Sequence, residues 1–179
     1  MVVHSFPTRR SSDLEPFLRE MRTAVEIPVV SLTESALLTS LTLGRGIGLI
    51  ANAPSVQFLV KSSVRKHELG ARVVDGLSLD PPVDEFGLAA AYSDPVEVVE
   101  NFTASARRLI ARGADMIVPA EGVMARLLSQ SGLTRIDRTP VIDVFAVAWT
   151  HALMQARLWR TTNLRIGRHW EYRRHAKEA

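Results

Sequence analysis

Residues 46–54 read GIGLIANAP and contain an apolar run, a short turn and a proline. The run GIGLIA lacks the alternation of polar and apolar residues seen in half-exposed strands, which is typical of a strand buried on both faces of a parallel sheet. Pro54 suits the first turn of a helix, where its missing N–H costs nothing. We therefore predict a buried strand, a turn at Asn52 and Ala53, and a helix that ends at Gly70.

The same alternation of short apolar runs and amphipathic segments extends in both directions along the chain. Thr33 is predicted to cap one helix, and Asp94, Pro95 and Glu97 mark the start of another. The pattern predicts an α/β fold with parallel βαβ units and helices on both faces of the sheet. Strands are predicted at residues 27–30, 46–51, 71–79, 114–118 and 140–144, and helices at 16–25, 34–43, 54–69, 85–91, 94–112, 123–130 and 145–160.

Composition excludes several classes of protein. The 179 residues are 46% hydrophobic, with Gly 10, Pro 9 and Cys 0, which excludes wholesale disorder, a fibrous chain and a disulfide framework. No run of about 18 apolar residues is present, so we expect no membrane partner and a cytoplasmic location. The sequence contains no P-loop and no HExxH motif, and its histidines lack metal-ligand spacing, so no metal site is predicted.

Positive charge is concentrated at the C-terminal end. Residues 157–179 hold six arginines and one lysine against two glutamates, so the net charge of +3 comes mainly from this tail. A basic tail can bind nucleic acid or an acidic partner. No recognised nucleic-acid-binding motif accompanies it, so we do not expect that function. A solvated end, or pairing of the arginines within a homo-oligomer, is the simpler interpretation.

The first residues differ from the rest of the chain. Residues 4–14, HSFPTRRSSDL, show neither the period of 2 nor the period of 3.6 that marks strands and helices. The stretch resembles the conceptual translation of a widely used sequencing adapter, so we expect residues 1–14 to be a non-native leader. A disordered tail and a transit peptide are the alternatives, and Arg9 and Arg10 superficially suit the latter.

Two turns at predicted strand ends are candidate ligand sites. In parallel sheets, ligands bind outside the carboxyl ends of strands, near helix N-termini whose free N–H groups attract anions. In the first turn Asn52 could donate to a carboxylate. In the second, Gly122 would let a ligand approach the backbone closely. Ordinary βα connections need the same small residues, so both interpretations stay open.

Glu121 is the most reactive candidate in the second turn. A carboxylate at the mouth of a sheet could serve as a general base or bind a cation. The neighbouring helix dipole favours its charged form and weakens it as a base unless burial compensates. A plain helix-start acid is the simpler interpretation.

Three segments carry a family resemblance: residues 26–36 (EIPVVSLTESA), 43–50 (LGRGIGLI) and 113–118 (GADMIV). They resemble the aspartate/glutamate/hydantoin racemase superfamily, and the likeness covers roughly residues 15–160. The resemblance implies two pseudo-symmetric Rossmann-like α/β lobes, each with a parallel sheet flanked by helices, and a site in the cleft between them.

The resemblance also divides the chain. Residues 15–43 would end the first lobe, 44–143 would form the second, and 144–160 would return to the first, followed by the basic tail at 161–179. The first lobe is then incomplete. Without its early strands we expect uncovered apolar helix faces.

Family members need no cofactor and use one cysteine from each lobe to remove and return a proton at the substrate's α-carbon. The second cysteine lies in a Gly-Cys-x-Gly turn, which here reads PAEG over residues 119–122, so Ala120 occupies its place. The first cysteine's place falls near Ser12, inside the leader. Alanine cannot transfer a proton, so the two-thiol mechanism is excluded for this chain.

The resemblance further implies a cleft for a small carboxylate, with Asn52 and Ala53 at the carboxylate-binding position and Thr33 on the hinge side. The first hypothesis is a cofactor-independent isomerase acting at the carbon α to the carboxylate of an amino acid or derivative. Glu121 would then replace the thiol, displaced by one residue. The alternative is a non-catalytic small-carboxylate binder or a decarboxylase-like paralogue.

Overall fold

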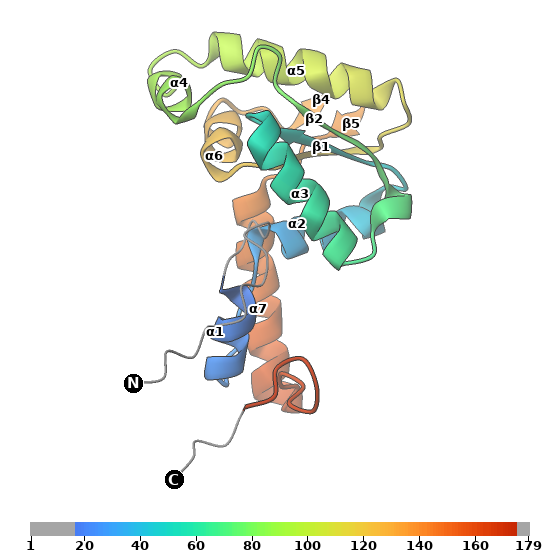
Figure 1. Ribbon diagram of the computed structural model, residues 1–179, viewed down its shortest axis with the longest axis vertical. Helices are drawn as coiled ribbons and strands as arrows, with labels where there is room; N and C mark the ends of the chain where they lie inside the picture. The colour runs from blue at the N-terminus through green and yellow to red at the C-terminus, as the bar shows by residue number, and fades with distance from the viewer. Residues whose placement is uncertain (1–16, 175–179) are drawn as a thin grey trace, which may run out of the picture.

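A three-stranded parallel sheet forms the centre of the protein, whose computed structural model describes residues 17–174 (Figure 1). The central strand β1 (Ile47–Ala51) lies between β2 (Val73–Ser78) and β3 (Met116–Pro119). Every residue of β1 is buried, as expected for a strand covered on both faces. The strands predicted at residues 46–51, 71–79 and 114–118 are therefore confirmed.

Alternating side chains along β1 separate two apolar cores on opposite faces of the sheet. Ile50 packs in one core with Phe102 of helix α5 (Val96–Ile110), and both side chains are fully buried. Leu49 points to the other face and packs in a core with Val60 of helix α3 (Pro54–Lys66). Burial of each such side chain stabilises the fold by about 1.5–3 kcal/mol. The predicted α/β class is thus confirmed, with helices α3 (Pro54–Lys66), α4 (Glu85–Ala90), α5 (Val96–Ile110) and α6 (Gly122–Gln130) around the sheet.

The strand predicted at residues 140–144 is mostly absent. Val141 makes a single parallel bridge to Ile117 at the edge of β3. The neighbouring residues form short antiparallel strands, β4 (Arg135–Ile136) and β5 (Thr139–Pro140). Pro140 has no N–H to donate to a sheet, and a helix already begins at Val144, so no longer strand fits here.

Three helices, α1 (Leu18–Ala24), α2 (Leu32–Leu43) and α7 (Val144–Thr162), make up the rest of the molecule. The long helix α7 extends away from the sheet, and α2 packs against it (Figure 1). These helices coincide with the segments assigned to the first lobe. Within residues 17–174 the only parallel sheet is formed by β1, β2 and β3, which lie in the segment predicted to be the second lobe.

Two predictions near α2 are wrong. Residues 27–30 form no strand, because no neighbouring strand in the described part of the chain offers partners for their backbone groups. The carbonyl of Val29 instead accepts hydrogen bonds from the Arg22 guanidinium at 3.1 and 3.0 Å. The cap of α2 is Ser31, whose hydroxyl accepts from the Glu34 N–H at 3.0 Å, and Thr33 lies inside the first turn.

The described part of the basic tail folds back onto α1. Arg168 donates to the carbonyls of Arg22 and Thr23 at 2.8 and 3.1 Å, and Arg174 donates to the carbonyl of Thr23 at 3.0 Å. These guanidinium groups satisfy the unpaired carbonyls and the negative dipole at the C-terminus of α1. Both arginines also form ion pairs with Glu26. Part of the positive charge of the tail is therefore paired with carbonyl and carboxylate groups of the same chain.

Helices α2 and α7 expose a broad apolar face. Trp149 and Leu153 of α7 are 70% and 57% exposed, and Leu38 of α2 is 49% exposed. Helices of this apolar character are normally covered on most sides. The uncovered apolar helix faces expected from the sequence are thus present. Among the described residues, no helix combines the length and apolar character needed to cross a membrane.

Candidate functional site

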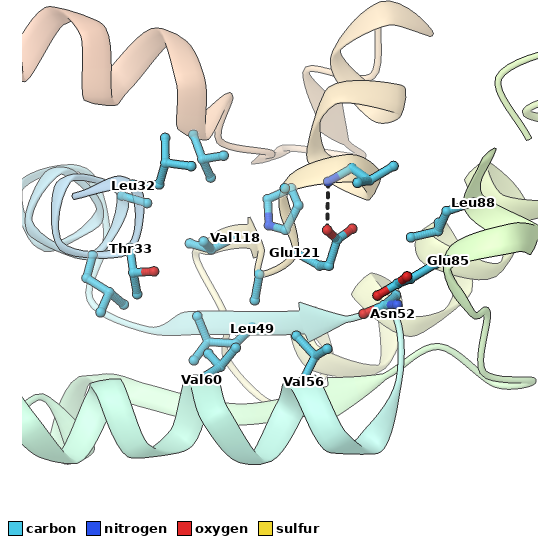
Figure 2. A pocket seen from close by; sticks show the side chains of 17 residues that line it. Leu32, Thr33, Leu49, Asn52, Val56, Val60, Glu85, Leu88, Val118 and Glu121 are labelled. Atoms are coloured by element: carbon cyan, nitrogen blue, oxygen red, sulfur yellow. Dashed lines mark hydrogen bonds between the residues drawn. The ribbon is translucent and has the colours of Figure 1, made fainter. Parts of the chain in front are cut away.

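A pocket of about 510 Å³ opens at the carboxyl ends of β1 and β3 (Figure 2). The N-terminal parts of α2, α4, α6 and α7 contribute to its wall, so that helix ends surround it. Most of its lining side chains are apolar. The polar or small lining residues are Thr33, Ala36, Asn52, Glu85, Ala120, Glu121 and Gly122.

The pocket brings together nearly all of the residues that the sequence singled out. Thr33, Asn52, Ala120, Glu121 and Gly122 line it although they come from three separate segments of the chain. The exception is Ala53, the other residue assigned to the carboxylate-binding position, which does not line the pocket.

That exception, Ala53, is the N-cap residue of α3. Its carbonyl accepts the first helical hydrogen bond from the Gln57 N–H at 3.0 Å, and its methyl side chain caps nothing. Its contribution here is to the turn between β1 and α3.

Ala120 follows directly after β3, and its N–H donates to the carbonyl of Ile50 at 2.7 Å. This bond continues the pairing of β1 with β3 and holds the Ala120 methyl at the pocket wall. A methyl group can neither donate nor accept a proton. The position assigned to a catalytic thiol is therefore filled by a group without acid–base chemistry.

Glu121 caps helix α6. Its two carboxylate oxygens accept from the backbone N–H groups of Val123 and Met124 at 2.8 and 2.7 Å, and the first of these bonds is drawn in Figure 2. The N-terminus of α6 is thus satisfied by the protein's own carboxylate. The helix-start interpretation of Glu121 is therefore supported by geometry.

Asn52 is only 5% exposed and is held on both sides by Val83. Its Nδ2 donates to the Val83 carbonyl at 2.9 Å, and the Val83 N–H donates to the Asn52 carbonyl at 3.0 Å. Because the Val83 carbonyl can only accept, the first of these bonds fixes which end of the Asn52 side chain is the nitrogen, and the second joins the two backbones. The Oδ1 atom is buried and has no partner. The unpaired atom of Asn52 is thus an acceptor, while its Nδ2 already donates to Val83.

Glu85 is a pocket residue that sequence reasoning missed. It begins α4 and lines the same pocket as Asn52. The sequence before Glu85 has an irregular pattern because it contains Pro81 and Pro82. The approach of Glu85 to the site depends on the hydrogen bonds between Asn52 and Val83. A cap-like Asp84 followed by a second acid was the available signal.

The electrostatics of the pocket are uniform in sign. Its ionisable lining residues are Glu85 and Glu121, and no lysine, arginine or histidine belongs to the described lining. No group of three or more His, Asp or Glu side chains within residues 17–174 is arranged to hold a metal ion. The wall therefore offers mainly hydrogen-bond acceptors and apolar surface.

Comparisons with known proteins agree on one family. The model of the Asp/Glu/hydantoin racemase family matches residues 11–152. The allantoin racemase from Klebsiella pneumoniae is structurally similar, with a TM-score of 0.73 and 22% sequence identity over 92% of this chain and 63% of that chain. The allantoin racemase from Pseudomonas fluorescens has a TM-score of 0.69 and 20% identity over 90% of this chain and 66% of that chain.

The present chain thus spans a little under two thirds of each of these two racemases. The comparison with curated proteins finds no match. The family match extends over most of the chain. It includes residues 26–36, 43–50 and 113–118, which carry the likeness seen in the sequence. The chain belongs to the Asp/Glu/hydantoin racemase family.

Proposed function

We propose that the protein is a cofactor-independent isomerase that acts at the carbon α to the carboxyl or carbonyl group of an amino acid or derivative. The pocket at the carboxyl ends of β1 and β3 would bind the substrate. The observation that carries the proposal is the gathering of Thr33, Asn52, Ala120 and Glu121 in this one pocket, in a chain of the racemase family. The names of the two structural neighbours favour cyclic ureides such as allantoin among the candidate substrates.

Proton transfer would fall to Glu121, since Ala120 has no ionisable group. The carboxylate of Glu121 lines the pocket one residue beyond the position assigned to the thiol. Its two backbone hydrogen bonds hold it in place. A displacement of this size costs much of the rate, so we expect slow turnover.

Hydrogen exchange in D2O tests the proposal directly. The protein is incubated with hydantoin, allantoin or L-aspartate, and deuterium at the α-carbon is followed by NMR. Exchange above the protein-free rate is expected with at least one compound, and Glu121→Gln should abolish it. Glu100→Gln, an exposed site on α5, is the matched control and should exchange like the wild type. Absence of exchange with all three compounds would rule out the isomerase.

A second candidate function is ligand binding without turnover. The capping role of Glu121 and the methyl group of Ala120 favour it, because neither residue is then needed for chemistry. A ligand at 100 times its Kd would add about 2.7 kcal/mol to the free energy of unfolding. Thermal stabilisation by a compound that shows no α-carbon exchange would identify this function.

The pocket would be completed by the rest of the first lobe. We propose that α1, α2 and α7 belong to a lobe whose sheet lies outside residues 17–174, because their apolar face is uncovered and the two similar racemases are longer. Extending the chain with the upstream sequence of its gene, read from an independent long-read genome, should cover this face. Protection of Trp149 from fluorescence quenching in the extended protein is the measurement.

A further inference from the structure

One buried acceptor in the pocket has no partner. Asn52 Oδ1 is closed off from solvent and accepts no hydrogen bond, and Asn52 as a whole is only 5% exposed. An unpaired buried polar atom destabilises a fold by about 1–3 kcal/mol. Figure 2 shows this oxygen on the side of the pocket, while the nitrogen faces the segment that leads into α4. A donor group of a ligand would remove the penalty.

Glu85 stands at the same end of the pocket (Figure 2). Its position follows from Asn52, since both hydrogen bonds between Asn52 and Val83 hold the chain just before α4. Asp84 adds to this order by accepting from the Gly87 N–H at 2.8 Å, which fixes the first turn of α4. The Glu85 side chain itself is exposed, so its carboxylate is free to contact a ligand at this end of the pocket.

We infer that the Asn52 carboxamide oxygen and the Glu85 carboxylate form an acceptor subsite that binds an N–H group of the ligand. This inference rests on the proposed function, in which the pocket holds the substrate. Both groups accept hydrogen bonds, and no cationic side chain of the described lining stands ready to pair with an anion. The subsite therefore selects a ligand for its N–H group at this end of the pocket.

Two kinds of ligand carry such an N–H group: a ureide, whose N–H is neutral, and an amino acid, whose N–H groups belong to an ammonium. Two matched pairs of probes separate them. Hydantoin is compared with 1,3-dimethylhydantoin, which lacks N–H groups, and L-aspartate is compared with succinate, which lacks the ammonium. Binding of each probe to the full chain is measured by isothermal titration calorimetry. In the pair that binds, the donor-free member should bind at least about tenfold more weakly.

Glu85→Gln identifies the source of that preference. It removes the charge and keeps the size, so an ammonium ligand should lose about tenfold in affinity, whereas a neutral ureide should lose much less. Glu85→Ala should reduce the preference for the donor-bearing member in either pair, which steric exclusion of the methyl groups alone would not do. Glu100→Gln is the control and should leave every affinity unchanged.

The outcomes separate the two proposals. If succinate or 1,3-dimethylhydantoin binds as tightly as its partner, or if Glu85→Ala leaves the preference intact, the subsite is overturned while the pocket keeps its proposed role. If none of the four probes binds, the proposed function fails and the subsite fails with it.

Discussion

Ala120 is the single side chain on which the expected rate of proton transfer depends most. Its methyl group lies at the pocket wall, next to Glu121 and within reach of any ligand bound there. The Ala120→Cys variant adds only one sulfur atom at a partly buried position, so the fold should tolerate it. A thiol at this position is expected to raise α-carbon exchange of a bound substrate by on the order of 100-fold, as a general base or acid does.

The same NMR assay in D2O measures this effect. Ala120→Ser is the control, because it adds a group of similar size whose hydroxyl is a much weaker base. Equal exchange rates in the cysteine and serine variants would show that a thiol at this position does not reach the substrate.

Arg22 and Glu34 form the most buried ion pair among the described residues, with both side chains 14% exposed. Burial by itself would raise the pKa of the Glu34 carboxyl, but hydrogen bonds and the charge of Arg22 outweigh burial and hold this pKa below its usual value. A carboxyl whose pKa is lowered by folding stabilises the protein above its unfolded pKa. That stabilisation is lost as the pH falls through the folded pKa. Stability should therefore drop below about pH 4.5, the ordinary pKa of glutamate.

Arg22→Gln tests the pair. Urea unfolding at pH 7 should show a loss of about 3 kcal/mol, because Glu34 is left charged and largely buried without its guanidinium partner, while His67 stays 3.5 Å away. The loss should shrink at pH 3.5, where Glu34 can take up a proton. Arg19→Gln breaks the exposed pair with Glu171 and serves as the control, with an expected change below about 1 kcal/mol. Equal losses for Arg22→Gln at both pH values would contradict the role of Glu34.

At the scale of elements, α7 depends on Asp143 at its start. One carboxylate oxygen accepts from the N–H groups of Phe145 and Ala146 at 3.0 Å each, and the other accepts from the Ser129 hydroxyl at 2.7 Å. Asp143→Ala should lower the free energy of unfolding by about 1–2 kcal/mol, which is the range for a lost helix cap. Asp143→Asn keeps an acceptor and should lose less. Chemical denaturation monitored by circular dichroism checks the order, and equal losses would argue against a capping role.

The elements also show how far local sequence signals reach. GIGLIA became the central strand as predicted, because two neighbouring strands and helices on both faces bury it. The run at residues 27–30 has a similar apolar character and yet forms no strand. A strand needs a partner for its backbone hydrogen bonds, and that partner is not a property of the run itself. The same reason explains why only one bridge remains of the strand predicted at 140–144.

At the scale of the whole molecule, the main feature is the exposed apolar face of α2 and α7. Trp149 and Leu153 are exposed in the described structure, so replacing both with Gln should change the free energy of unfolding by less than about 0.5 kcal/mol. The double variant should also aggregate less, because a large exposed apolar patch drives association. Light scattering at increasing concentration and urea unfolding provide the two measurements. A loss of several kcal/mol would instead mean that this face is covered in solution, by a second copy of the chain.

The sequence by itself determined the α/β class, the central strand and its two neighbours, and the absence of any thiol at the site. Apolar runs, caps and residue identity are local properties, and each acts before the chain is folded. It also pointed to Asn52, Ala120 and Glu121, because turns after buried strands of a parallel sheet open at a common edge.

Only the tertiary structure decided what these residues offer to a ligand. Contacts across 31 positions engage the Asn52 nitrogen, leave its Oδ1 unpaired and bring Glu85 to the same end of the pocket. The N-terminus of α6 takes up both oxygens of Glu121. Hydrogen-bond partners depend on where other segments lie, so the chemistry of the site was settled by the fold and not by the motif.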